Sequence, residues 1–336
     1  MKELEPWASA ETRALFEDAW THSERVLQRC RAHLAARLPR FDLDPGTLCF
    51  VATGSVGRRE ALSASDLDLI VIVEGDSAYE RLTERYAELR GGLSRALDGM
   101  DVSSGRTVMG LVKLDELVDP ERIGLDKDDR IALTRRTLVL TEAAEAGGAL
   151  GLRSIRRQIL EAYIRRTGDA HPLALCNDVA RYYRQLCIDY KAKHGENDFQ
   201  WAESKVKLRH ARKFWYYCTS LAIIAAHFKA SSQPEKLTTG LIDAFDQPPC
   251  LRLLLAEPRG AASISAILDH YAAYLREMNS AELRARLRVL NHQRRKEDPD
   301  YLRLQENSRA LHESMLALLW QVKPDVQRKV LDWFLL

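Results

Sequence analysis

Two aspartates, Asp66 and Asp68, stand two residues apart at the start of an apolar run. In an extended chain, residues i and i+2 project from the same face, so both carboxylates point the same way. Paired carboxylates suit Mg²⁺, because phosphate oxygens can complete its octahedral shell. The upstream pair Gly54-Ser55 offers a backbone that can approach a phosphate closely, a hydroxyl and N–H donors. These residues predict a site for a nucleoside triphosphate and Mg²⁺, with Mn²⁺ as an alternative ion.

Hydrophobic patterning predicts the elements that position these residues. The β-branched and aromatic run 47–53 leads into Gly54 and is typical of a buried strand. Residues 66–73 alternate carboxylate with leucine and then become wholly apolar, as in a strand that starts at a polar site. We also expect helices over 8–38 and 77–97 and extended segments over 100–104 and 106–112.

The order of these motifs resembles the polymerase-β-type nucleotidyltransferase superfamily. Gly54-Ser55 is followed by Gly57-Arg58-Arg59-Glu60 and then by Ser65-Asp66-Leu67-Asp68 at the start of a strand. Within the superfamily, this form is most similar to the uridylyltransferases of the nitrogen regulator PII and to their uncharacterised bacterial relatives. The resemblance covers residues 47–112 and continues weakly through 129–138.

The resemblance implies roles for individual residues. Gly54 and Ser55 would bind the triphosphate, and Asp66 and Asp68 would be ligands of two Mg²⁺ ions. The superfamily has a third carboxylate on the next strand, which makes Asp101 the candidate for holding the catalytic metal and helping to deprotonate the acceptor hydroxyl. Asp115 and Glu116 are weaker alternatives, because they fall at the far end of the predicted hairpin.

The chain also departs from the PII enzymes. It has no C-terminal extension of the HD-phosphohydrolase type, no room for tandem ligand-sensing domains, and no glycine-rich motif in its helical part. These differences weaken PII as the substrate.

Basic residues supply further candidates for binding the nucleotide. Arg58 and Arg59 are expected beside the site, where one contacts phosphate and the other pairs with Glu60; the sequence does not say which. Helical spacing places some further cations of 177–191 on one face, and others form a dense positive patch beside aromatic residues over 201–215, which suits a triphosphate or an RNA acceptor. For both segments, a solvated helix face is the alternative interpretation. These further candidates are Arg181, Arg184, Lys191, Lys205 and Lys207.

Composition bounds the class of protein. The chain has 336 residues, 46% of them hydrophobic, and its net charge of +2 gives no overall attraction to nucleic acid or anionic membranes. The six cysteines form no CxxC pair, which indicates reduced core thiols. The acidic N-terminus does not resemble a signal peptide, and no apolar run reaches membrane-spanning length. We therefore expect a cytoplasmic enzyme without membrane partners.

The sequence predicts an α+β fold, in which a polymerase-β-like domain with a small mixed sheet and helices is followed by an all-α domain. The expected parts are an N-terminal helix (1–40), a catalytic domain (41–120) and a helical domain (121–336) that forms the other wall of a cleft. After Leu114 no convincing strand is expected; the β-branched residues of 137–140 are the one exception, and their neighbours favour a helix. Gly147-Gly148 is interpreted as a break between helices.

The predicted reaction moves a nucleotide from an NTP to an acceptor hydroxyl and releases pyrophosphate. A protein, an RNA end including tRNA, a small molecule and a second nucleotide all remain open as acceptors. The alternative is a non-catalytic nucleotide sensor that retains the fold. The sequence leaves the base of the NTP and the oligomeric state open.

Overall fold

The computed structural model divides into two compact units. Unit 1 comprises Met1–Asp18, Val179–Ala225 and Pro249–Leu336, and unit 2 comprises Ala19–Asp178 and Ala226–Pro248. This division splits single helices between the units, so the domain boundaries expected near residues 40 and 120 stay predictions. The structure describes residues 1–63, 65–102, 109–124, 129–167, 171–193, 200–256 and 261–335.

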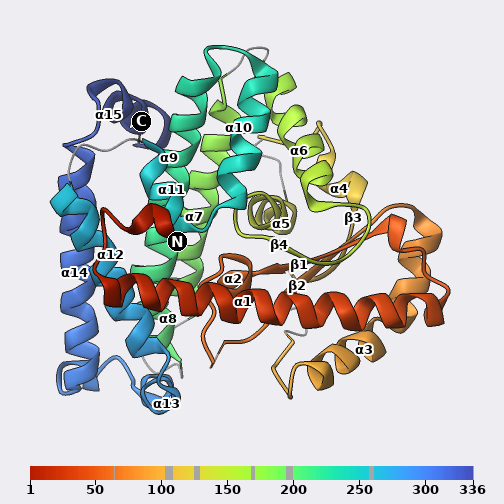
Figure 1. Cartoon of the computed structure of the whole chain (residues 1–336), viewed down its shortest axis with the longest axis horizontal. Helices are drawn as coiled ribbons and strands as arrows, with labels where there is room; N and C mark the ends of the chain where they lie inside the picture. Colours follow the sequence, from red (N-terminus) through yellow and green to blue (C-terminus); the bar gives the residue numbers. More distant parts are fainter. Residues whose placement is uncertain are drawn as a thin grey trace. The chain divides into compact units, whose positions relative to one another are not determined.

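Unit 2 contains a four-stranded sheet with the order β3-β2-β1-β4 (Figure 1). Strand β1 pairs antiparallel with both neighbours, β2 and β4, whereas β2 and β3 run parallel. The sheet is therefore small and mixed, as predicted. The strands are β1 (Leu48–Thr53), β2 (Asp68–Val73), β3 (Gly110–Lys113) and β4 (Ala144–Gly148).

Helices pack around this sheet. Helix α1 (Ala10–Arg37) enters unit 2 at Ala19, and α3 (Asp76–Ala96) follows β2. The short helices α2 (Gly54–Gly57) and α4 (Leu114–Val118) directly follow β1 and β3. The remaining helices of unit 2 are α5 (Arg130–Thr141), α6 (Leu152–Thr167), α10 (Pro234–Asp246) and the first turn of α7 (Leu173–Lys193).

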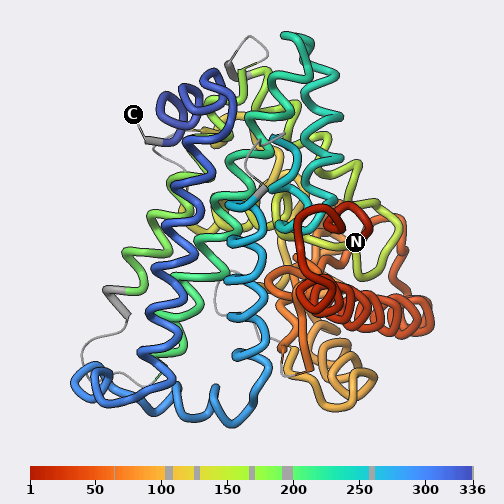
Figure 2. Tube along the Cα trace, turned by 60° about the vertical axis from the view of Figure 1, so that its left-hand side comes forward, coloured from red at the N-terminus to blue at the C-terminus, as the bar shows by residue number. Residues whose placement is uncertain are grey.

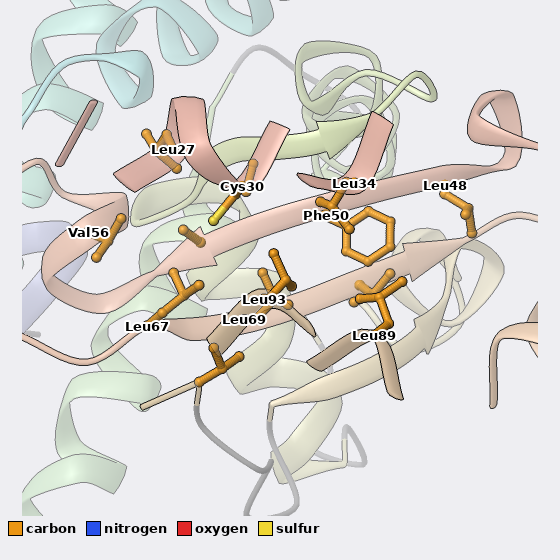
Figure 3. Close-up of a cluster of buried hydrophobic side chains, with 14 of the residues drawn as sticks. Leu27, Cys30, Leu34, Leu48, Phe50, Val56, Leu67, Leu69, Leu89 and Leu93 are labelled. Atoms are coloured by element: carbon orange, nitrogen blue, oxygen red, sulfur yellow. The ribbon is translucent and has the colours of Figure 1, made fainter. Parts of the chain in front are cut away.

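The core of unit 2 joins α1, the sheet and α3 (Figure 3). Leu27 and Leu34 of α1 are fully buried, as is Phe50 of β1. Leu89 and Leu93 of α3 belong to the same cluster. Burial of this much apolar surface fixes the strand register, because a slip by one residue would turn each side chain to the other face.

Unit 1 is helical. Its helices α12 and α14 pack along each other (Figures 1 and 2). The helix that begins with α8 (Trp201–Lys207) continues through a π-helical segment, Leu208–Arg212, into α9 (Lys213–Ala230), which leaves unit 1 after Ala225. Its other helices are α7 from Val179, α11 (Pro249–Arg252), α12 (Ala261–Met278), α13 (Ala281–Val289), α14 (Pro299–Leu319) and α15 (Pro324–Val330).

The chain also contains short 3₁₀ and π segments. The 3₁₀ segments are Lys2–Leu4, Leu38–Phe41, Pro45–Thr47, Leu253–Ala256 and Arg294–Lys296, and a second π segment covers Leu331–Leu335. No helix in the described part of the chain has the length and apolar composition that crossing a membrane requires.

Most elements of the first 120 residues were predicted correctly, and the predicted α+β fold class is confirmed. The two long helices and the strands β1 and β2 agree with the predictions to within about two residues. Of the segment 100–104, Val102 forms an isolated parallel bridge with Leu67, and residues 103–108 lie outside the described residues. Strand β3 confirms the C-terminal half of the segment 106–112.

The expectation of no strand after Leu114 is wrong. Strand β4 reads Ala-Glu-Ala-Gly-Gly, without the β-branched residues that usually indicate a strand. Gly148 adopts φ +86, and a Cβ there would overlap the carbonyl oxygen of Leu48 in β1. The glycine that looked like a helix break therefore permits close pairing of β4 with β1.

Candidate functional site

The turn after β1 lies against the start of β2. Thr53 pairs with Asp68 across the antiparallel ladder, and its hydroxyl donates to the Asp68 carbonyl at 3.4 Å. Gly54 follows with φ +63, and a Cβ there would lie 2.6 Å from the Oδ2 atom of Asp68. The Asp68 carboxylate thus occupies space that only glycine leaves open.

Strand register places Asp101 beside the other two aspartates. The N–H of Leu67 donates to the carbonyl oxygen of Asp101 at 2.9 Å, and Leu67 forms a parallel bridge with Val102. Leu67 and Val102 both face the apolar core. Because side chains alternate along extended chain, Asp66, Asp68 and Asp101 occupy positions on the opposite face. The prediction of Asp101 as the neighbouring carboxylate is consistent with this register.

The carboxylates differ in exposure. Asp66 and Asp101 are exposed, and Asp68 is half-buried. Across the described residues, no three His, Cys, Asp or Glu side chains converge closely enough to form a ready metal site. Register therefore brings the three positions to one face, although their side chains do not form a closed set of ligands.

Asp115 and Glu116 lie at the other end of the sheet. They begin α4, directly after β3, whose last residue Lys113 pairs with Val73 at the end of β2. Asp68 stands at the start of β2, so the length of the parallel strands separates it from both alternatives. Asp101 is the better placed of the three candidates.

The turn that carries Ser55 is closed by backbone hydrogen bonds. The N–H of Glu60 donates to the Ser55 carbonyl at 2.8 Å, and the N–H of Arg58 donates to the Gly54 carbonyl at 3.0 Å. Ser55 itself is half-buried. These bonds hold the Gly54-Ser55 turn in place before any ligand binds.

Arg58 lies in a buried ion cluster. Its Nε donates to Glu60 at 2.7 Å, and its Nη1 donates to Glu142, which follows α5. All three side chains are at most 5% exposed. Of the two arginines expected beside the site, Arg58 is therefore the one that pairs with Glu60. Its position indicates that Arg58 fixes the turn after α2 against the segment between α5 and β4.

Arg59 lies against α1. Its guanidinium donates to Glu24 at 2.8 Å and stacks over the Trp20 ring, 4.8 Å from its centroid. Arg59 has φ +59, a backbone conformation that non-glycine residues rarely adopt. The contacts with α1 stabilise this strained residue, which lies two residues after the end of α2.

Sequence reasoning missed Glu142 and Glu24, the partners of these arginines. Both stand far from the motif in the sequence, and nothing in their spacing links them to it. One feature of the sequence could have indicated such partners. Arg58 and Arg59 are adjacent and beside the candidate phosphate turn, and Glu60 alone cannot neutralise the charge of both.

The basic candidates of the helical part lie in unit 1. Arg181 is half-buried and Arg184 is exposed. Lys205 lies over the Tyr190 ring, with Nζ 4.7 Å from its centroid. Lys207 pairs with the buried Glu203 at 2.9 Å. The side chain of Lys191 lies outside the described residues.

Comparison with known families finds a similarity to nucleotidyltransferases over part of the chain. Residues 8–107 match the family model described as "Putative nucleotidyltransferase DUF294". The matched range contains the Gly54-Ser55 turn and all three aspartates. No curated protein matches the chain.

Proposed function

We propose that the protein is a Mg²⁺-dependent nucleotidyltransferase that moves an NMP from an NTP onto an acceptor hydroxyl. The observation that carries the proposal is the register of Leu67 with Val102, which aligns three aspartate positions on one face beside the Gly54 turn. The family match supports the general reaction type. The acceptor oxygen bonds to the α-phosphorus, the bond from that phosphorus to the β-phosphate oxygen breaks, and pyrophosphate leaves.

The aspartates fit a magnesium site by their donor chemistry. Asp66, Asp68 and Asp101 present hard carboxylate oxygens, the donors that Mg²⁺ takes in proteins. When bound, Mg²⁺ neutralises the negative charge of the phosphates. Asp101 has a second role in the proposal, since its carboxylate accepts the proton that leaves the acceptor hydroxyl.

Other residues bind or position the nucleotide in this proposal. The backbone of Gly54 and the hydroxyl of Ser55 contact the triphosphate, because the turn is fixed and its glycine lets a phosphate approach. Arg58 acts as a positioning residue, since its contacts are with buried carboxylates. Arg59 stays a candidate phosphate contact. The helical candidates Arg181, Arg184, Lys191, Lys205 and Lys207 stay proposed nucleotide-binding residues.

The PII protein is one acceptor to be tried. The similarity to PII uridylyltransferases rests on the GSxGRRE and SDLDL motifs. The helical part lacks the glycine-rich motif of those enzymes, which favours a different acceptor.

The test is incubation of the purified protein with each α-³²P-labelled NTP, Mg²⁺ and a cell lysate, followed by separation of protein, RNA and small molecules. We expect label in one fraction with the native protein and none with Asp66→Asn. Glu84→Gln, which alters an exposed carboxylate of α3, is the matched control and should retain transfer. Binding of NTP without transfer to any fraction would contradict the proposal and favour the nucleotide sensor.

A further inference from the structure

Positive charge is concentrated in two segments of unit 1. Residues 201–213 and 281–297 together contain eleven Lys and Arg and three Glu, a net charge of +8. The whole chain is +2, so all other residues together carry −6. Helix α8 lies in the first segment and α13 in the second, and the two helices contact each other (Figure 1).

A single buried carboxylate joins the two helices. Glu203 of α8 is 4% exposed and accepts from Arg288 of α13 at 2.7 Å and from Arg284 at 3.3 Å. Lys207 completes the group at 2.9 Å from Glu203. One carboxylate thus faces three cations, and the side chains of Lys207 and Arg288 are 46% and 49% exposed. Lys207 and Arg288 therefore present part of their charged side chains to solvent.

Two more cations, Arg209 and Arg295, lie near Tyr301. Tyr301 packs on Trp201 at the start of α8, with 5.5 Å between the ring centroids. Burial raises the pKa of the Tyr301 hydroxyl, and the charges of Arg209 and Arg295 oppose that rise. Both arginines therefore lie near the same side chain although they come from different segments. Within the described ranges, neither of them forms an ion pair with a carboxylate.

We name these cations, together with their neighbours in the second segment, the α8–α13 surface. It comprises Lys207, Arg209, Arg284, Arg288, Arg294, Arg295 and Lys296. Five of the seven are arginines, whose planar guanidinium matches phosphate oxygens in a bidentate way.

The apolar content of this surface is low. Trp201 and Tyr301 are buried, and among the described residues of the two segments Val289 is the one large apolar side chain that is prominently exposed, at 68%. Protein interfaces usually need buried aromatic or apolar anchors, and base recognition needs exposed stacking platforms. This surface is rich in cations, although Glu297 lies 3.6 Å from Arg294, and its net positive charge suits the regularly spaced phosphates of a nucleic-acid backbone.

We propose that the α8–α13 surface binds the phosphate backbone of an RNA, and that the end of this RNA supplies the acceptor hydroxyl. The first part stands on the charge and exposure of the surface. The second part rests on the proposed function: a ribose terminus carries the hydroxyl which that reaction needs, on the same molecule as the polyanionic backbone.

The binding test uses a fluorescein-labelled RNA hairpin, with fluorescence anisotropy measured from about 50 to about 200 mM KCl. The test variant combines Arg288→Gln, Arg294→Gln and Lys296→Gln, three exposed residues of the second segment. The matched control removes three exposed cations elsewhere through Lys229→Gln, Lys236→Gln and Arg328→Gln. Thermal unfolding of both variants verifies that they fold.

We expect the test variant to bind RNA at least about tenfold more weakly than the control at about 100 mM salt. For the test variant, the slope of the logarithm of the RNA-binding constant against the logarithm of the salt concentration should be less steep than for the control. The difference should be about two to three, roughly one for each lost phosphate contact. A test variant that binds RNA as tightly as the control would overturn the proposal. Equal affinity for a DNA hairpin, or equally effective displacement of the RNA by polyglutamate, would overturn the commitment to RNA.

Assays of nucleotide transfer to RNA distinguish a failure of this proposal from a failure of the proposed function. Asp66→Asn should bind the hairpin as the native protein does while transferring no nucleotide to RNA. The surface variant should raise the KM for RNA and leave kcat nearly unchanged, because it removes contacts with the RNA backbone and alters none of the residues proposed for the reaction. If RNA binding depends on the α8–α13 surface but no nucleotide is transferred to any acceptor, the proposed function is contradicted and the proposal of RNA binding is supported. Transfer to another acceptor, with no labelling of RNA, would refute the RNA acceptor.

Discussion

At the scale of single residues, the candidate site depends on how closely Gly54 approaches Asp68. A Cβ on Gly54 would lie 2.6 Å from Asp68 Oδ2, and the backbone there has φ +63. An added methyl group therefore has to displace the carboxylate, besides costing roughly 1 kcal/mol of backbone strain.

The Gly54→Ala variant should accordingly lose activity more than stability. We expect transfer to fall by about 100-fold, since a displacement of the order of 1 Å at a reacting group has that effect. The thermal midpoint should fall only by as much as backbone strain explains. Gly75→Ala is the matched control, because Gly75 has φ +87 and nothing within 4 Å of its Cβ position. Equal transfer rates in the two variants would contradict the geometry assigned to Asp68.

Arg58 tests whether the turn depends on a buried ion cluster. Arg58→Met leaves Glu60 and Glu142 buried without this cation, so urea unfolding should show a loss of about 3–5 kcal/mol. Arg29→Met removes an arginine from the exposed pair with Asp98 and should cost far less, because solvent screens an exposed ion pair. If both substitutions cost the same, Arg58 does not have the positioning role assigned to it.

His210 gives unit 1 a pH-dependent stability. It is fully buried, and burial lowers its pKa to about 4, an effect to which the charges of Lys213, Arg209 and His270 add. The unfolded chain protonates this imidazole near pH 6.5, so the folded state binds fewer protons between those values. The stabilisation is present above about pH 6.5 and is lost as the pH falls toward about 4, on the order of 3 kcal/mol.

Urea unfolding at a series of pH values measures this effect. The free energy of unfolding of the native protein should decline more steeply between about pH 6.5 and about pH 4.5 than that of His210→Gln. His22, His33 and His312 also have lowered pKa values and titrate in both proteins, so the difference between the two curves isolates His210. Parallel curves would show that His210 does not contribute.

The candidate site residues could be recognised because they are local in sequence. Gly54, Asp66 and Asp68 form a short motif whose spacing specifies both a turn and a strand face. Asp101 depended on the resemblance, which implies a third carboxylate on the next strand. Glu142 and Glu24 could not be predicted from the sequence. They stand 84 and 35 residues from Arg58 and Arg59, and ion pairs at such separations leave no periodic pattern.

At the scale of elements, the strands that bury their apolar side chains were predictable and β4 was not. Strand β1 is buried along its whole length, and its residues show that in their composition. Strand β4 is short, pairs only with β1 and contains glycine where a side chain would strike its neighbour. These glycines are required by tertiary packing of β4 on β1. The strand propensity of the segment itself is low, so the sequence alone does not predict a strand there.

Gly148 provides the prediction at this scale. Gly148→Ala should destabilise the protein by at least about 2 kcal/mol more than Gly75→Ala, measured by urea unfolding. Both glycines have a positive φ, +86 and +87, so an added Cβ strains the backbone in both variants. The difference is the overlap of the added methyl group with the Leu48 carbonyl, which can be relieved only by moving β4 away from β1. Equal stability of the two variants would mean that β4 does not pair closely with β1.

At the scale of the whole molecule, net charge conceals how charge is distributed. A chain of net charge +2 gives no reason to expect a polyanionic partner, so an overall attraction to nucleic acid was not predicted. The contact between α8 and α13 brings together two basic segments that residues 214–280 separate in the chain. Only the fold brings segments this far apart together, so the α8–α13 surface is visible in the structure and not in the composition.

The central claim is nucleotidyl transfer at the aspartate face, and the position of the transferred label tests it most directly. Parallel reactions would contain the same NTP labelled with ³²P at either the α- or the γ-phosphate, together with Mg²⁺ and the acceptor fraction, for the native protein and for Asp68→Asn. We predict that the native protein transfers the α-label to the acceptor and releases the γ-label as pyrophosphate, and that Asp68→Asn does neither. Transfer of the γ-label to the acceptor, or unchanged transfer of the α-label by Asp68→Asn, would contradict the account.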